Sequence, residues 1–280
     1  MIRRTFSTVI LWTALGGILF LFGAHAGVLL ILLLALFSQY ELYKLLDRDG
    51  TPTLRIPGLA AGGALILGPY VLSMSTDRIA PLTAGASILA IGLVLVALCA
   101  LARPQPRRVQ ALATTALGLS LVAFPLHFFV QVLLMAATPE KGLLLALWVI
   151  VVVKVADIGA YVFGSLFGKH KLAPELSPGK TWEGVAGGMA SSMLLGAAFV
   201  ALFSESLPAA LTPVTAAAFI LPIAAVSVPS DLLESVFKRH AGVKDSGTSI
   251  PGIGGAYDLS DSLILSAPVA YVLLILFIYS

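Results

Sequence analysis

The carboxylates near the C-terminus are the side chains of this sequence best placed to do chemistry together. Asp231 follows Pro229-Ser230, and Asp258 and Asp261 are spaced i, i+3 just before the last apolar run. That spacing resembles a capping box at a helix start, which could account for one of the two carboxylates. Two carboxylates there, with Asp231 within reach, favour a divalent cation, because hard oxygen ligands select magnesium or manganese.

A lysine after a turn signal is the second candidate group. Pro178-Gly179 predicts a turn, and the next helix is expected to begin near Thr181. Lys180 would then stand at a helix N-terminus, where free N–H groups and the helix dipole favour an anion. Its ammonium adds a point charge suited to phosphate.

A dense polar stretch joins the two groups of carboxylates. Residues 231–240 carry an apolar stripe opposite a charged face, which by itself is typical of a short amphipathic helix at a membrane surface. Lys244-Asp245 follows, and then three glycines within residues 252–255, which let a backbone approach a ligand closely. The sequence thus combines carboxylates suited to a metal ion, lysines suited to phosphate and a glycine-rich loop. This combination indicates phosphoryl or nucleotidyl transfer. The Gly-x-x-x-x-Gly-Lys-Ser/Thr pattern of P-loop enzymes is absent from the sequence.

Lys154 and Asp157 interrupt an otherwise apolar run. Their i, i+3 spacing places the ammonium and the carboxylate on one face of a helix. Charges at this depth are costly and usually face a partner or a polar cavity. We therefore keep two interpretations, a structural pair that neutralises itself and a site facing a hydrated cavity, and favour the second.

Long apolar helices are the elements that would position these groups. The 280 residues are 59% hydrophobic and 11% charged, against roughly 45–50% and 25% in soluble domains. The apolar runs are long enough to cross a bilayer, which takes about 20 helical residues. Helices are expected because lipid offers no partner for backbone polar groups. The fifth run contains Pro125 and His127, which predicts a kink. We expect an all-α polytopic membrane protein with about nine transmembrane helices, at 6–23, 26–42, 56–75, 81–102, 110–136, 143–163, 183–203, 214–229 and 262–279.

The basic residues predict the orientation of these spans. With a cytosolic N-terminus, all of the 17 Lys and Arg residues except Arg78, Lys141 and Lys154 fall on the cytosolic side. This bias is what the positive-inside rule describes.

Residues 1–150 lack a cluster of reactive groups and are expected to be N-terminal transmembrane scaffold helices. Residues 151–280 are expected to form the C-terminal transmembrane catalytic region, with its active site at the cytosolic face. Cys99 is the single cysteine, so no internal disulfide can form.

Two segments resemble a known family. Residues 156–184, ADIGAYVFGSLFGKHKLAPELSPGKTWEG, look like one strongly shared segment of the phosphatidate cytidylyltransferases, or CDP-diacylglycerol synthases. The second segment is similar to the signature of that family, and its matching residues are Ser235, Phe237, Lys238, Arg239, Lys244, Asp245, Gly247, Ile250, Pro251, Gly252, Gly254, Gly255, Asp258 and Asp261. Together they cover roughly the C-terminal 40% of the chain, and the N-terminal spans are similar to the family in hydropathy only.

The resemblance implies transfer of CMP from CTP to phosphatidate with a magnesium cofactor, and manganese or a second cation is compatible with it. Carried over by position, Asp231 and Asp258 would be the main metal ligands, with Asp261 nearby. Phosphates would be contacted by Lys180, Lys238, Arg239 and Lys244. The polar pocket would be completed by Asp157, Ser235, Asp245 and the glycines Gly254 and Gly255.

The implied partners are CTP, phosphatidate and the lipid bilayer, with no nucleic acid, and a homodimer is compatible with the sequence. The implied location is the bacterial inner membrane, with the site facing the cytoplasm. Two positions depart from the family, which usually has His where Ile253 stands and Arg where Leu259 stands. Any role of those two groups is absent here or taken by others, such as His240 or Arg239.

Two other functions remain open. Polyprenol- or phytol-type lipid kinases that use CTP share a Lys-Ser/Thr-x-Glu-Gly element, here Lys180 to Gly184, but lack the long second segment. A transporter could use Lys154 and Asp157 as an ion relay. Its expected sign is a pair of matching halves with discontinuous helices, whereas the polar groups here lie in one half.

Overall fold

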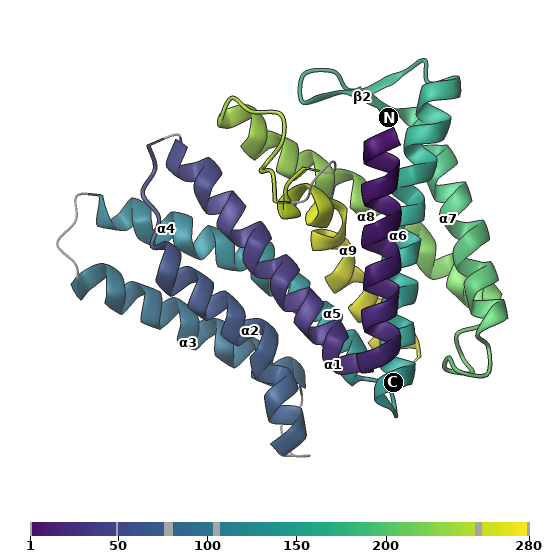
Figure 1. The fold of residues 1–280 in the computed structure, drawn as a ribbon, viewed down its shortest axis with the longest axis horizontal. Coiled ribbons are helices and arrows are strands. Elements are labelled where there is room, and N and C mark those ends of the chain that lie inside the picture. The colour runs from purple at the N-terminus through teal and green to yellow at the C-terminus, as the bar shows by residue number, and fades with distance from the viewer. Residues whose placement is uncertain (1, 49, 76–80, 103–106, 250–253, 279–280) are drawn as a thin grey trace. The chain divides into compact units, whose positions relative to one another are not determined.

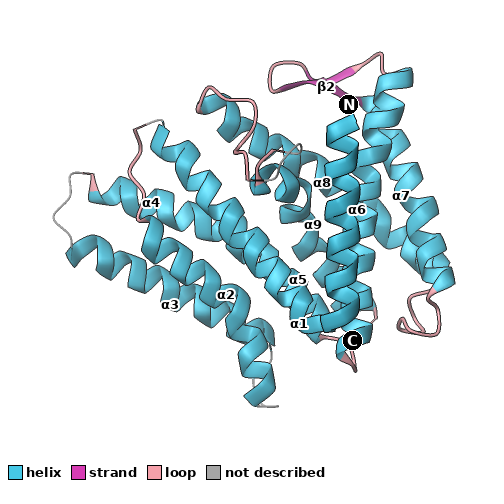
Figure 2. Cartoon of the chain, in the orientation of Figure 1, coloured by secondary structure: helices cyan, strands magenta, loops and turns pink. Residues whose placement is uncertain are grey.

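The computed structural model describes residues 2–48, 50–75, 81–102, 107–249 and 254–278. Figure 2 shows that helices make up nearly all of this part of the chain, with one small β-hairpin. The residues group into two compact units, 1–134 with 237–260 and 135–236 with 261–280. Two helices, α8 (Pro213–His240) and α9 (Ala256–Phe277), contribute residues to both units.

Eight of the nine expected membrane spans have a matching helix among the described residues, all but the one expected at 6–23. Within the described residues, eight helices are long and apolar enough to cross a bilayer, which confirms an all-α polytopic membrane protein. The first two expected spans form one element, α1 (Ile2–Arg48), which is broken at Gly23 with φ 57° and ψ −138°. Only glycine adopts this conformation readily, so the short link at residues 23–27 is a break at a single residue rather than a loop.

The first unit contains the N-terminal helices, coloured purple to teal in Figure 1. Its buried apolar cluster comprises Leu54, Leu65, Val96, Ala100, Ala111, Leu119 and Ala123. The helices of this unit are α1, α2 (Arg55–Ser75), α3 (Pro81–Ala102), α4 (Arg108–Gly118), the π-helical turn η1 (Leu119–Ala123) and α5 (Phe124–Leu134).

Near Pro125, where a kink was predicted, the helix contains this π-helical turn, and the kink itself stays a prediction. Residues Leu119–Ala123 are π-helical, and regular helix resumes at Phe124. Proline has no N–H to donate and its ring crowds the carbonyl four residues earlier, so a widened turn before it relieves the clash. Just before this turn, the Thr115 carbonyl of α4 accepts a hydrogen bond at 2.9 Å from the buried Tyr43 hydroxyl of α1.

In the second unit, α6 (Pro139–Phe167) and α7 (Trp182–Leu202) lie side by side (Figure 1). Small residues let their backbones approach closely. A Cβ on Gly188 would overlap the Ala156 carbonyl oxygen and would lie 3.0 Å from the Ala160 nitrogen. The fully buried Trp148 donates from its indole nitrogen to the Gly196 carbonyl at 3.1 Å. The packing of this pair depends on the absence of side chains as much as on their presence.

A β-hairpin precedes α7 and was not predicted. Strand β1 (Lys171–Ala173) pairs antiparallel with β2 (Ser177–Thr181). The turn lies at residues 174–176, so the prediction of a turn at Pro178-Gly179 is wrong. Proline is tolerated in β2 because a two-stranded ribbon consists of edge strands, where a missing donor costs little.

The prediction of a separate amphipathic helix after the 214–229 span is also wrong. Helix α8 runs without interruption from Pro213 to His240 and includes Pro229. It ends as predicted near Gly242, whose φ is 67°. There the Val243 N–H donates to the Lys238 carbonyl at 2.9 Å, a Schellman-type stop. The last helix begins at Ala256, several residues earlier than the expected 262.

We expect Gly188→Ala to destabilise the protein by about 1–3 kcal/mol, because the added methyl group meets backbone atoms that cannot rotate away. Gly17→Ala is the matched control, since a Cβ at Gly17 has nothing within 4 Å. Thermal unfolding in detergent micelles measures the difference. Equal midpoints for the two variants would contradict the account of α6–α7 packing.

Candidate active site

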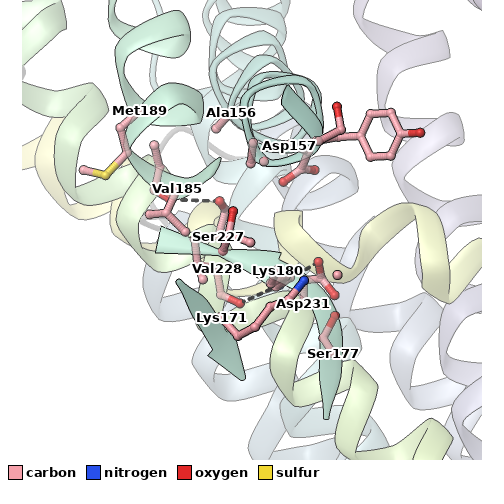
Figure 3. A pocket seen from close by; sticks show the side chains of 17 residues that line it. Ala156, Asp157, Lys171, Ser177, Lys180, Val185, Met189, Ser227, Val228 and Asp231 are labelled. Carbon is pink, nitrogen blue, oxygen red and sulfur yellow. Dashed lines mark hydrogen bonds and ion pairs between the residues drawn. The ribbon is translucent and has the colours of Figure 1, made fainter. Parts of the chain in front are cut away.

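A pocket of about 470 Å³ lies in the second unit. Its walls come from α6, the hairpin, α7 and α8, as Figure 3 shows. Charged and hydroxyl side chains line it together with apolar ones, so it offers both a polar and an apolar surface. The polar side chains are Asp157, Tyr161, Ser165, Lys171, Ser177, Lys180, Thr181, Ser227 and Asp231. The larger apolar side chains are Val185, Met189 and Val228.

Lys180 and Asp231 form an ion pair in the wall of this pocket. The Lys180 Nζ lies 2.7 Å from Asp231 Oδ2 and donates to the Val228 carbonyl at 3.2 Å (Figure 3). Lys180 lies at the end of β2, and the side chain of Thr181 caps α7 by accepting from the Gly184 N–H at 3.1 Å. Lys180 therefore stands at a helix start as predicted, but its ammonium is directed to a carboxylate of α8.

Asp231 is also part of a carboxylate cluster. Oxygen atoms of Asp231, Glu234 and Asp261 all lie within 4.8 Å of one another. Asp231 and Glu234 are spaced i, i+3 on α8 and so share a face, and Asp261 comes from α9. Sequence reasoning missed Glu234, although the same i, i+3 spacing that was used for Lys154 and Asp157 would have found it.

Lys154 compensates the carboxylates on the α6 side. Its Nζ lies 3.2 Å from Asp157 Oδ2 and 3.9 Å from Asp261 Oδ1. It also donates to the Ser262 hydroxyl at 2.8 Å, and that hydroxyl donates to Asp157 Oδ2 at 2.7 Å. The pair predicted from spacing thus exists, but it is not isolated, because Asp261 and Ser262 of α9 join it.

Asp258 belongs to the first unit, where it has several partners. Lys238 Nζ lies 2.8 Å from Asp258 Oδ1. Asp258 Oδ2 accepts from the Gly255 N–H at 2.7 Å and from the Ser246 N–H at 2.9 Å. The bond to Gly255 is the return half of a capping box at the start of α9, so capping accounts for part of this carboxylate's role. Asp231 lies in the second unit, and the convergence of Asp231 and Asp258 on one cation stays a prediction.

The remaining predicted residues lie on α8 and the loop that follows. Ser235 is buried, whereas Arg239 is exposed and donates to the Val243 carbonyl at 3.3 Å. Lys244 and Asp245 are exposed in the loop. Gly254 has φ 130°, and a Cβ there would lie 2.8 Å from Asp258 Oδ2.

The structure describes only one of the two positions that depart from the family pattern. Leu259 is half-buried in the first turns of α9. Ile253 lies outside the described residues. The roles suggested for Arg239 and His240 in their place stay predictions.

A further carboxylate, Glu41 of α1, was not singled out from the sequence. It is 2% exposed and accepts hydrogen bonds from Ser246 Oγ at 2.9 Å and from the Tyr257 N–H at 2.9 Å. Its only sequence signal is the polar end of an apolar run, Gln39-Tyr40-Glu41. The predicted scaffold region therefore contributes an acidic group to the α8–α9 loop.

The fold and this site define a polytopic membrane protein with lysine-compensated carboxylates beside a pocket between its helices. The sequence profile of the cytidylyltransferase family matches residues 2–277. The chain belongs to this family.

Several curated relatives are similar to the chain. It is 33% identical over 249 residues to a phosphatidate cytidylyltransferase of Staphylococcus haemolyticus, covering 89% of this chain and 91% of that protein. It is 45% identical over 130 residues to one of Haemophilus influenzae, covering 46% of this chain and 45% of the relative. A Pseudomonas aeruginosa relative of the same name is 45% identical over 134 residues, which is 48% of each chain.

We expect Lys154→Met to destabilise the protein by about 1–3 kcal/mol, because it leaves half-buried carboxylates without their cation. Adding Asp157→Asn to this variant should restore part of the lost stability, since the double change removes both charges of the pair. Thermal unfolding of the two single variants and the double variant measures the coupling. Additive losses would show that Lys154 does not compensate Asp157.

Proposed function

We propose that this protein is a phosphatidate cytidylyltransferase, which transfers CMP from CTP to phosphatidate and releases pyrophosphate. The observation that carries the proposal is the cluster of Asp231, Glu234 and Asp261 beside the pocket-lining Lys180. The chain belongs to the cytidylyltransferase family, and its relatives are named phosphatidate cytidylyltransferases. The distribution of Lys and Arg favours an active site on the cytoplasmic face of a bacterial inner membrane.

The donor set fits a magnesium ion. Asp231, Glu234 and Asp261 would hold it, since they offer several hard oxygen atoms within 4.8 Å of one another, and magnesium takes carboxylate and phosphate oxygens in preference to softer ligands. Two lysines lie beside this cluster, because Lys154 pairs with Asp157 and Asp261, and Lys180 pairs with Asp231. The bound ion would neutralise charge on the nucleotide phosphates.

The residues of the chain would bind and orient the two substrates. A phosphate oxygen of phosphatidate attacks the α-phosphorus of CTP, the bond from that phosphorus to the β-phosphate oxygen breaks, and pyrophosphate leaves. This nucleophile is already anionic, so no strong general base is needed. Lys180 supplies an ammonium at the pocket wall for phosphate oxygens, and the apolar side chains Val185 and Met189 line the same pocket.

Labelled CTP tests this proposal against the lipid-kinase alternative. Purified protein with CTP, phosphatidate and magnesium should place label from the α-phosphate, and none from the γ-phosphate, in the lipid product. Thin-layer chromatography of the extracted lipid measures both. Label from the γ-phosphate in lipid would identify a kinase, and no CDP-lipid at all would refute the proposed activity.

The metal assignment predicts a specific effect of Glu234. Glu234→Gln removes one ligand charge, so we expect the magnesium concentration for half-maximal activity to rise about tenfold or more, in the range reported for disturbed metal sites. The matched control is Glu205→Gln, because Glu205 is exposed in the loop after α7. An unchanged magnesium dependence in folded Glu234→Gln would exclude Glu234 as a ligand.

A further inference from the structure

Glu41 is a buried carboxylate on α1 whose hydrogen-bond partners among the described residues lie more than two hundred residues away in the sequence. Its Oε2 accepts from Ser246 Oγ at 2.9 Å and from the Tyr257 N–H at 2.9 Å. Its Oε1 accepts from Ser249 Oγ at 2.5 Å. Both oxygens of this carboxylate are therefore used to hold the α8–α9 loop, of which the structure describes residues 241–249, 254 and 255, and the first turn of α9.

A second polar contact fixes α1 against α9 one turn away. Ser38 Oγ lies 2.8 Å from Ser260 Oγ, and both side chains are fully buried. Ser38 and Glu41 are spaced i, i+3 on α1, as are Tyr257 and Ser260 on α9, so each pair lies on one face of its helix. The two contacts together fix the register of the helices, which makes the position of Glu41 well defined.

The glycines of the loop fit around this carboxylate. A Cβ on Gly247 or on Gly255 would overlap the Glu41 carboxylate oxygens. At Gly255 the same Cβ would also meet the Ser246 hydroxyl. Gly255, one of the three glycines that suggested a ligand-binding loop, thus also lets the backbone close around Glu41, as does Gly247.

Ser246 connects Glu41 to the charged groups expected to contact phosphates. Its hydroxyl lies 2.9 Å from Glu41 Oε2 and 3.0 Å from Asp258 Oδ2, and Asp258 in turn pairs with Lys238 at 2.8 Å. Hydrogen bonds to ionised groups are about twice as strong as neutral ones. A change at Glu41 would therefore be transmitted through Ser246 to Asp258 and Lys238.

We propose that Glu41 is a positioning residue, which holds the α8–α9 loop in the conformation that binds CTP. The assignment rests on the proposed function, and it gives a residue of the N-terminal helices a role in holding the loop that carries Lys244 and Asp245. Glu41 does not contact the reacting atoms in this account. It acts through the serines, the glycines and the Asp258–Lys238 pair.

Steady-state kinetics and limited proteolysis test the assignment. In Glu41→Ala we expect the KM for CTP to rise about tenfold or more, because three hydrogen bonds to a charged group are lost, with a smaller change in kcat per folded molecule. A variant that only lowers the folded fraction would reduce the apparent kcat and leave the KM unchanged. Trypsin cleavage after Lys244, which is exposed in the loop, should become about fivefold faster or more as the loop opens.

Asp47→Asn is the matched control, since Asp47 lies on the same helix and binds Arg55 and Thr53 instead of the loop. It should leave both readouts unchanged. An unchanged KM for CTP or an unchanged cleavage rate in folded Glu41→Ala overturns the proposal. If Glu41→Ala does not fold, Glu41→Gln and Ser249→Ala decide by the same readouts. If the wild-type protein forms no CDP-lipid, the proposed function fails, and the cleavage rate alone decides whether Glu41 holds the loop.

Discussion

The ion pairs of Lys154 and Lys180 are the interactions on which the second unit's site depends. Each lysine pairs with a carboxylate from another element, Lys154 of α6 with Asp261 of α9 and Lys180 of β2 with Asp231 of α8. A single charged side chain at the centre of a membrane helix costs about 2.5–3.5 kcal/mol in insertion experiments. Bringing acidic groups together there without lysines would add their mutual repulsion to that cost. The two lysines lower both the cost of each half-buried carboxylate and the repulsion between the carboxylates.

Helix geometry explains how so few residues build the site. Asp231 and Glu234 share one face of α8 through i, i+3 spacing, and the close approach of α6 and α7 depends on glycines such as Gly188. The hairpin β1–β2 then places Lys180 against α8, because the Thr181 side chain starts α7 directly after it. Helices α8 and α9 supply the carboxylates, and strand β2, which precedes α7, supplies the ammonium of Lys180.

Much of this could be predicted from local sequence, because hydropathy and spacing act over short distances. The apolar runs predicted the helices, and the i, i+3 spacing of Lys154 and Asp157 predicted their contact. The continuity of α8 through Pro229 could not be predicted, since proline is tolerated when neighbouring helices stabilise the break in hydrogen bonding. The role of Glu41 could not be predicted either, because its partners are distant in sequence. One polar residue at the end of an apolar run also resembles an ordinary helix end.

Manganese binding to the purified protein without nucleotide tests the central claim most directly, namely that Asp231, Glu234 and Asp261 together form a site for a divalent cation. Manganese takes the same oxygen ligands as magnesium, and its electron paramagnetic resonance signal distinguishes free from bound ion. The account predicts one bound ion in the wild-type protein that is lost or greatly weakened in folded Asp261→Asn. Equal manganese binding by the wild-type protein and this variant would contradict it.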